Sequence, residues 1–282
     1  MEIRKVGVLG SGIMGSGIAE VAAEAGYEVV LRSRKQETAD HMRTSVERSL
    51  LRKIEKGRMS EDTARDILGR IQTTADIDAL GGCNLVIESV VEDLNIKKNL
   101  FSELSIIVDA STIIATNTST LPVVELAAVT KHPERVCGIH FFNPATVMKL
   151  VEIVTPITAS DETVATAIAF AKSLNKDVVK VKDQAGFIVN ALLFPYLNNA
   201  IRMADSAMAS IEEIDIAMKG GCGFPMGPFA LLDLVGLDTS LAILDALYEE
   251  FRDANFAPAP LLKRMVAAGF LGRKTKKGFY SY

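Results

Sequence analysis

The stretch Lys5-Val-Gly-Val-Leu-Gly-Ser-Gly-Ile-Met-Gly-Ser-Gly-Ile-Ala19 decides the fold of this chain. It begins with a short apolar run, passes through G-x-G-x-x-G and continues into a helical pattern, which is the order strand, turn, helix. In such a turn Gly10 makes the tight bend, Gly12 lets the backbone approach a pyrophosphate, and Gly15 lets the helix pack against the strand. A second apolar run, Glu28–Leu31, follows at the distance of a neighbouring strand. Together these parts predict a dinucleotide-binding unit.

Composition and charge are those of an ordinary globular protein. The chain has 282 residues, of which 49% are hydrophobic and 23% charged, and its formal net charge is −4. This length accommodates two domains, and the acidic balance gives no reason to expect a nucleic-acid partner. The longest uncharged stretch, residues 185–201, contains three asparagines and a proline. It therefore predicts a buried helix rather than a membrane span.

The cysteines argue against a disulfide framework and against a zinc site. Cys83, Cys137 and Cys222 are far apart, odd in number and without the spacing of metal ligands. We therefore expect free thiols in a reducing compartment and no bound metal. The first predicted strand begins almost at the first residue, which leaves no room for a targeting peptide. A cytoplasmic location is the corresponding expectation.

Up to residue 183 the sequence alternates strands with helices. Most predicted strands are continuous apolar runs, which is typical of strands that are covered on both faces. The expected fold is α/β, with a Rossmann-type, mostly parallel sheet. A long helical segment, residues 36–70, exceeds an ordinary crossover and must project from this sheet as an arm. The predicted strands are Val6–Leu9, Val29–Leu31, Leu85–Ser89, Ile113–Thr116, Val136–Phe141, Leu150–Val154 and Val178–Val181.

From residue 184 onward the pattern is entirely helical. We expect a dinucleotide-binding domain over residues 1–183 and an all-α domain for substrate binding and dimerisation over 184–282. The second domain is rich in apolar residues, which favours a subunit interface; a core that also contacts the first domain is the alternative. The predicted helices are 188–203, 211–220, 229–251 and 260–268, and the apolar residues are Phe194, Leu197, Phe229, Leu231, Leu232, Leu234, Leu241 and Leu244.

His140 and Glu152 are candidates for acid–base chemistry. His140 lies at the end of an apolar strand, and the carboxyl ends of strands are where open α/β sheets bind ligands. Glu152 lies in an apolar run, Leu150–Val154, and a carboxylate in such a run needs a partner. If the two strands are neighbours, Glu152 accepts a hydrogen bond from one imidazole nitrogen and raises the basicity of the other. A core histidine beside an unrelated carboxylate is the alternative.

Two further polar features allow two interpretations each. Thr116–Thr120 follows a predicted strand, and its side chains either cap the next helix or face a nicotinamide ribose and a substrate oxygen. Asn190 stands alone in an otherwise apolar helix. Its amide is either satisfied by the backbone or reaches into the cleft between the domains.

Taken in order, these motifs resemble those of the L-3-hydroxyacyl-CoA dehydrogenases. The resemblance covers essentially the whole chain. The length of the chain is similar to that of the single-function 3-hydroxybutyryl-CoA dehydrogenases. It rests on Gly10–Gly15, Glu88–Glu92, Thr116–Thr120, His140–Pro144, Lys149–Glu152, Gly186–Asn190, Met226–Pro228, Asp233–Asp238 and Gly272–Tyr280.

This resemblance implies an enzyme that interconverts (S)-3-hydroxybutyryl-CoA and acetoacetyl-CoA by hydride transfer between C3 and a nicotinamide cofactor, as a homodimer without membrane or nucleic-acid partners. It implies that His140 is the general acid/base, that Glu152 orients it, and that Ser119 and Asn190 hydrogen-bond the reacting oxygen. A β-hydroxyacid dehydrogenase acting on a free acid is one alternative, although those enzymes use a lysine of the second domain. A non-catalytic nicotinamide-binding protein is the other.

The resemblance also implies binding residues for the cofactor and for CoA. The region of the arm that receives the CoA nucleotide has an independent indication, because residues 43–58 contain six basic and two acidic residues. A solvated helix face is the alternative reading of these charges. The implied cofactor contacts are Gly10, Ser11, Gly12, Ile13, Met14, Gly15, Glu92, Lys97, Asn117, Asn143 and Lys274, and those for CoA are Ser49, Lys53 and Lys56 in addition to Ser119 and Asn190.

The end of the second predicted strand departs from the family pattern. An acidic residue at this position binds the adenosine ribose and repels a 2′-phosphate. Here the residue is Ser33, between Arg32 and Arg34. This change predicts that the protein accepts NADP, with these three residues near the phosphate. Solvated arginines and the use of NAD are the alternative.

Overall fold

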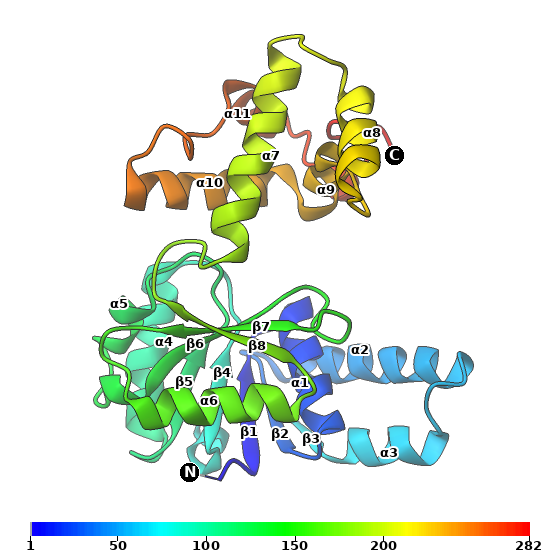
Figure 1. The fold of residues 1–282 in the computed structure, drawn as a ribbon. Coiled ribbons are helices and arrows are strands. Elements are labelled where there is room, and N and C mark those ends of the chain that lie inside the picture. Colours follow the sequence, from blue (N-terminus) through cyan, green and yellow to red (C-terminus); the bar gives the residue numbers. More distant parts are fainter. Residues whose placement is uncertain (1) are drawn as a thin grey trace. The chain divides into compact units, whose positions relative to one another are not determined.

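The computed structural model describes residues 2–282 and divides the chain into two compact units. The first ends at Asp183 and the second runs from Gln184 to Tyr282 (Figure 1). The first is built around a sheet, and the second is made of helices.

The sheet of the first unit has eight strands in the order β3-β2-β1-β4-β5-β6-β7-β8. Neighbouring strands are parallel except for β6 and β7, which are antiparallel. The strands β4, β5 and β6 are buried along their whole length, which explains their continuous apolar sequences. The Rossmann-type, mostly parallel sheet is thus confirmed. The strands are β1 Lys5–Leu9, β2 Glu28–Arg32, β3 Ile71–Thr74, β4 Leu85–Glu88, β5 Ile113–Thr116, β6 Val136–Phe141, β7 Leu150–Thr155 and β8 Asp177–Lys182.

Helices connect these strands, and several begin at residues that cap them. Ser60, Asp93 and Ser160 each accept a hydrogen bond from the backbone N–H three residues later, which satisfies a group that the helix itself leaves open. The helix α1 packs on β1 and β2, and α6 packs on β6, β7 and β8. The helices are α1 Ile13–Glu24, α2 Gln36–Glu55, α3 Glu61–Gly69, α4 Leu94–Ile107, α5 Val123–Ala127 and α6 Asp161–Ser173.

The projecting arm consists of two helices and is followed by a strand that the sequence prediction missed. The chain reverses after α2, where Gly57 adopts a φ of +66°, and α3 returns against α2 (Figure 1). Residues 71–74 then form β3, which pairs with β2 at the edge of the sheet. Its sequence, Ile-Gln-Thr-Thr, contains one buried residue, so it lacks the apolar run by which the other strands are identified. The predicted helical segment 36–70 is therefore two helices rather than one, and the strand that follows it was missing from the prediction.

The second unit contains five α-helices and one short 3-10 helix, Arg273–Thr275, among the described residues. The predicted helix 229–251 is divided at Gly236, whose φ of +103° an L-residue rarely adopts. Most of the apolar side chains noted above form the core of this unit, whereas Leu234 is 49% exposed. The helices are α7 Val189–Asp205, α8 Ile211–Cys222, α9 Pro228–Val235, α10 Leu237–Phe251 and α11 Pro260–Ala267.

The cysteines are free thiols. Cys83 and Cys137 are buried in the first unit, and Cys222 is exposed. Burial raises the pKa of Cys83 to about 11 and that of Cys137 to about 12, so both remain protonated at neutral pH. Within residues 2–282, none of the helices combines the length and the apolar character that a membrane span requires.

Candidate active site

The carboxyl ends of four parallel strands bring the polar motifs of the first unit together. The strands β1, β4, β5 and β6 run in the same direction, so the residues at their ends share one edge of the sheet. Gly10, Glu88, Thr116 and His140 lie there. This is the edge at which open α/β sheets bind ligands.

His140 lies between a buried carboxylate and a serine hydroxyl. In the antiparallel pair β6–β7, His140 stands directly opposite Glu152. Its Nδ1 lies 2.8 Å from Oε2 of Glu152, and its Nε2 lies 3.2 Å from Oγ of Ser119. Because a carboxylate can only accept, Nδ1 carries a proton, and in the neutral imidazole Nε2 is then the acceptor. His140 and Glu152 are almost completely buried. The imidazole is therefore held in one orientation, with Nε2 toward Ser119.

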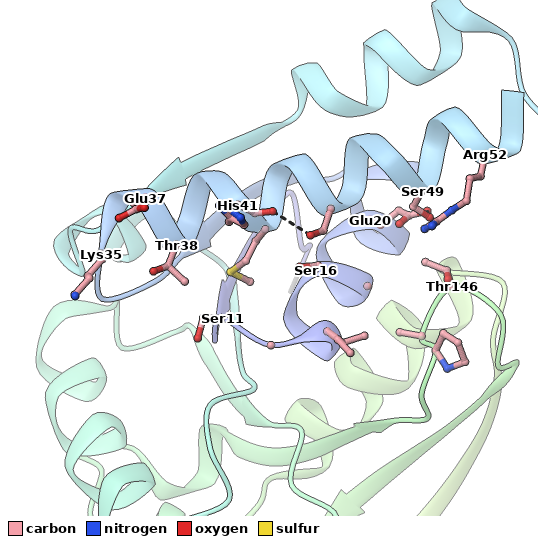
Figure 2. A pocket seen from close by; sticks show the side chains of 17 residues that line it. Ser11, Ser16, Glu20, Lys35, Glu37, Thr38, His41, Ser49, Arg52 and Thr146 are labelled. Atoms are coloured by element: carbon pink, nitrogen blue, oxygen red, sulfur yellow. Dashed lines mark hydrogen bonds between the residues drawn. The ribbon is translucent and has the colours of Figure 1, made fainter. Parts of the chain in front are cut away.

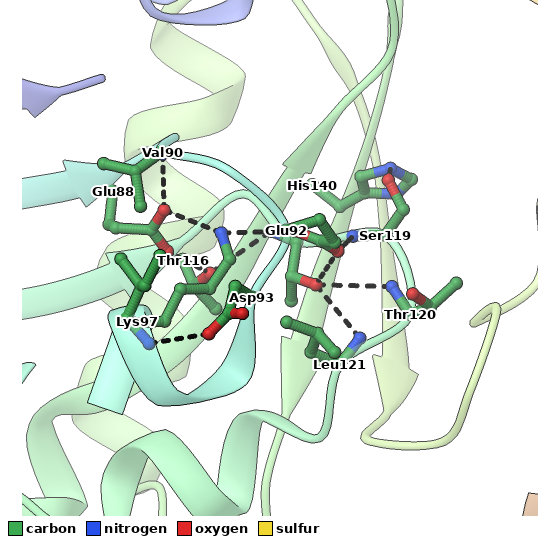
Figure 3. Close-up of polar contacts among 12 residues, drawn as sticks. Glu88, Val90, Glu92, Asp93, Lys97, Thr116, Ser119, Thr120, Leu121 and His140 are labelled. Carbon is green, nitrogen blue, oxygen red and sulfur yellow. Dashed lines mark hydrogen bonds and ion pairs between the residues drawn. The ribbon is translucent and has the colours of Figure 1, made fainter. Parts of the chain in front are cut away.

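Glu92 fixes the position of Ser119. Its Oε1 accepts hydrogen bonds from the hydroxyl of Thr118 and from the backbone N–H of Ser119, the latter over 3.0 Å (Figure 3). Its Oε2 lies 3.2 Å from Nζ of Lys97. The loop after β5 is therefore held by Glu92 of the segment between β4 and α4, and the hydroxyl of Ser119 lies within hydrogen-bond distance of His140.

Lys97 and Glu88 form a buried ion pair beneath this loop. Nζ of Lys97 lies 2.7 Å from Oε1 of Glu88, and both side chains are at most 1% exposed. Glu88 also accepts from the N–H of Val90 over 2.6 Å and from the hydroxyl of Thr116 over 2.7 Å (Figure 3). The ammonium is shared with Glu92. Lys97, implied above as a cofactor contact, thus has its charge neutralised inside the protein.

The glycine turn has the geometry that a pyrophosphate requires. Gly10 has a φ of +135°, and a Cβ there would lie 2.1 Å from the carbonyl oxygen of Ser89. At Gly12, by contrast, a Cβ would meet nothing within 4 Å, so the space beside it is open. Ile13, the first residue of α1, has a 76% exposed side chain. The N-terminus of α1 therefore faces open space, and its N–H groups are suited to bind an anion.

A pocket of about 520 Å³ adjoins this turn at the end of β2. Arg32, Ser33 and Arg34 line it beside the glycines, while Asn99 and Glu103 line it from α4. Nε of Arg32 donates to the carbonyl of Ala75 over 3.3 Å. The structure thus brings together the glycine turn and the Arg-Ser-Arg segment that the sequence singles out.

A groove of about 620 Å³ lies between α1 and α2, and the loop after β6 also lines it (Figure 2). Ser11, Ile13 and Ser49 are among the residues that line it. Lys53 is bound to Glu20 and Glu24 of α1. Lys56, at the C-cap of α2, is exposed.

The remaining predicted site residues lie in loops and in the second unit. Asn117 accepts from the N–H of Phe141 over 2.8 Å and so ties β5 to β6. Asn143 precedes a cis proline. In the second unit, Asn190 is buried in α7, and Nζ of Lys274 lies 2.5 Å from a carboxylate oxygen of Asp238.

Comparison with known proteins identifies the family. Residues 5–184 match the family model "3-hydroxyacyl-CoA dehydrogenase, NAD binding domain", and residues 186–282 match the C-terminal domain of the same enzymes. The chain belongs to the 3-hydroxyacyl-CoA dehydrogenase family. It is an oxidoreductase with an NAD-binding domain.

Several relatives within this family are similar over their full lengths. The 3-hydroxybutyryl-CoA dehydrogenases of Mycobacterium tuberculosis and Clostridioides difficile are each 45% identical over 99% of both chains. A crystal structure of an (S)-3-hydroxybutyryl-CoA dehydrogenase from Ralstonia eutropha has a TM-score of 0.97 at 42% identity and covers 100% of this chain and 99% of its own. The crystal structure of FadB2 from M. tuberculosis has a TM-score of 0.98 at 45% sequence identity, and the match covers 100% of both chains.

Two residues of this 3-hydroxyacyl-CoA dehydrogenase escaped the sequence analysis as individual site residues. Glu88 ends an apolar strand, which is the same signal that singled out Glu152, and its ion pair is described above. Glu20 lies within a helix whose other buried residues are small or apolar, and it reaches the groove from α1. Among the described residues, no cluster of histidine, cysteine, aspartate and glutamate is placed to hold a metal ion.

Proposed function

We propose that this protein is an (S)-3-hydroxybutyryl-CoA dehydrogenase, which interconverts (S)-3-hydroxybutyryl-CoA and acetoacetyl-CoA. The observation that carries the proposal is the arrangement Glu152–His140–Ser119 at the carboxyl edge of the sheet. Relatives of 45% and 42% identity bear the corresponding names. An acid–base group beside a nicotinamide site is what the oxidation of a secondary alcohol requires.

In the proposed reaction His140 moves the proton of the substrate hydroxyl. Nε2 accepts this proton, and Glu152 stabilises the imidazolium that forms. The nicotinamide cofactor, when bound, supplies the hydride chemistry. Ser119 holds the reacting oxygen while its charge changes, and Asn190 of the second unit is proposed as the second group that binds this oxygen. In the opposite direction His140 returns the proton.

The cofactor and CoA sites are part of the same proposal. The glycine turn would hold the pyrophosphate, with Glu92, Asn117, Asn143 and Lys274 toward the nicotinamide end. The groove between α1 and α2, with Ser49, is proposed for the CoA nucleotide. The second unit is proposed to bind substrate and to dimerise.

Reduction of acetoacetyl-CoA, followed at 340 nm with NADH and with NADPH, tests the proposal. Turnover is expected with the thioester and not with free acetoacetate. Absence of turnover with either cofactor would show that the protein is a non-catalytic nicotinamide-binding member of the family. Turnover of the free acid alone would indicate a β-hydroxyacid dehydrogenase.

We further propose that NADP is an accepted cofactor because of Ser33. The pocket at the end of β2 is lined there by a neutral residue between two arginines, and its acidic residue Glu103 comes from α4 instead. Arginine binds phosphate well. Introducing a carboxylate, Ser33→Asp, should raise the preference for NADH over NADPH in kcat/KM by about tenfold to a hundredfold, because it repels a 2′-phosphate.

The matched control for this change is Ser33→Ala, which removes the hydroxyl without adding charge and should move the ratio much less. Parallel kinetics with both cofactors measure the ratio. Strict use of NADH by the parent enzyme, or an unchanged ratio in Ser33→Asp, would contradict the proposal.

Dimerisation through the second unit gives a further expected result. Leu192, Met208 and Ile216 are more than 60% exposed on its helices and the turn after α7, and apolar surface of this kind marks interfaces. Light scattering should give about twice the 30.4 kDa of one chain. Leu192→Asp should lower the mass toward one chain, whereas Ile157→Asp, at an exposed position of the first unit, should not. A parent protein of 30.4 kDa at micromolar concentration would refute the dimer.

A further inference from the structure

Glu20 is a buried carboxylate in the wall of the groove, and no step proposed above uses it. Its Oε1 accepts from the hydroxyl of Ser49 over 2.9 Å and lies 2.9 Å from Nζ of Lys53. Glu24, one turn further along α1, pairs with the same ammonium. Glu20 is 2% exposed and lines the groove together with Ser49 and Arg52 (Figure 2). Two carboxylates from α1 therefore hold the lysine of α2 that is implied for CoA binding.

The charge of this cluster changes the electrostatics of the arm. Residues 43–58 are strongly basic in the sequence, but Lys53 together with its two carboxylates has a formal charge of −1, which leaves Arg52 as the cation of α2 that lines the groove. Lys53 thus contributes no positive charge of its own to an incoming anion. A phosphate that binds Lys53 must first displace the carboxylates that already pair with its ammonium. Glu20 is the buried partner, with a side chain that is 3% exposed, and a buried carboxylate that loses its cation is destabilised.

We propose that Glu20 sets the affinity of the arm for the nucleotide part of the acyl-CoA, by competing with its phosphates for Lys53. The inference rests on the proposed function. The competition weakens binding of any CoA thioester, substrate and product alike, and leaves the chemistry at His140 untouched. Glu20 is in this sense a determinant of binding strength, and it acts through Lys53.

The variant Glu20→Gln tests the competition with little change in shape. Glutamine still accepts from Ser49 through its amide oxygen, but it carries no charge. Burial raises the pKa of Glu20, against the hydrogen bond from Lys53, so the measurements are made at pH 8, because higher pH favours the charged carboxylate. The Kd of CoA, by calorimetry, and the KM of acetoacetyl-CoA should both fall by about three- to tenfold at low ionic strength, and the gain should shrink as salt is added.

Two comparisons assign the effect to the proposed contact. Acetoacetyl-pantetheine lacks the nucleotide, so its KM should be the same in Glu20→Gln and in the parent. Glu47→Gln removes the same charge from an exposed position of α2 that does not line the groove, and it should change neither constant. In the double variant with Lys53→Met the gain should disappear, since Glu20 acts through that lysine.

Each other outcome counts against the inference. Equal constants for Glu20→Gln and Glu47→Gln would overturn it, as would weaker CoA binding in Glu20→Gln, which would mean that Glu20 orients Lys53 for the ligand. If Glu20→Gln does not fold, Glu24→Gln, which frees the same ammonium from a more exposed carboxylate, should show the same direction; an unchanged Kd there overturns the inference too. Failure of the proposed function looks different, because the parent would then turn over neither thioester.

Discussion

Replacing His140 by glutamine should lower kcat for acetoacetyl-CoA reduction by about 10²–10⁴-fold, the usual contribution of a positioned acid–base group. Glutamine can still donate a hydrogen bond to Glu152, which lies 2.8 Å from the imidazole nitrogen, so the buried carboxylate keeps a partner. It cannot take up or release a proton at neutral pH. The loss should therefore appear in kcat, whereas cofactor affinity should change little, because the glycine turn belongs to a different part of the strand edge.

Steady-state kinetics and a cofactor titration by fluorescence measure the two quantities separately. His132→Gln is the matched control, since this histidine is exposed and interacts with Glu134 at the surface. It should behave like the parent. A loss of less than about tenfold in His140→Gln would show that another group moves the proton.

The variant Lys97→Met should lower the free energy of unfolding by about 3–5 kcal/mol, because it leaves a buried carboxylate without its countercharge. Glu88 is fully buried and would then face Glu92 with no cation between them. Its remaining hydrogen bonds, from Val90 and Thr116, do not neutralise the charge. Since Glu92 also holds the N–H of Ser119, kcat should fall as well. Urea denaturation of the complete chain measures the change in stability.

The adjacent residue provides the control for this change. Lys98 pairs with Glu125 at a partly exposed position, and Lys98→Met should cost about 0–1 kcal/mol, as is usual for surface pairs. Adding Glu88→Gln to Lys97→Met removes the stranded charge and should restore part of the stability. Equal stability of Lys97→Met and Lys98→Met would mean that the buried pair is energetically unimportant.

The parts of the site that could be predicted from the sequence are those that follow from local pattern. The glycine turn is contiguous, and its helix and strand adjoin it. Glu152 could be paired with His140 because a carboxylate in an apolar strand needs a partner and the chain offered one on the preceding strand. The register of β6 and β7 places these residues directly opposite each other.

What could not be predicted depends on contacts between distant segments. The strand β3 shows one buried residue because it lies at the edge of the sheet, so its sequence carries no apolar run. The pairing of Lys53 could not be predicted from residues 43–58 alone, because its carboxylates come from α1, about thirty positions earlier. Glu92 and Lys97 were assigned to the cofactor by resemblance. The buried pair of Lys97 with Glu88 depends on the contact of α4 with β4, which the sequence does not show.

The reversal of direction between β6 and β7 separates the His140–Glu152 pair from the loop that lines the groove. His140 and Glu152 lie opposite each other because β6 and β7 pair in this register. Their contact therefore depends on the strands and not on the loop that connects β6 to β7. That connection contributes Pro144, Ala145 and Thr146 to the groove. The connecting loop can therefore change, and reshape the groove, while the contact between His140 and Glu152 stays in place.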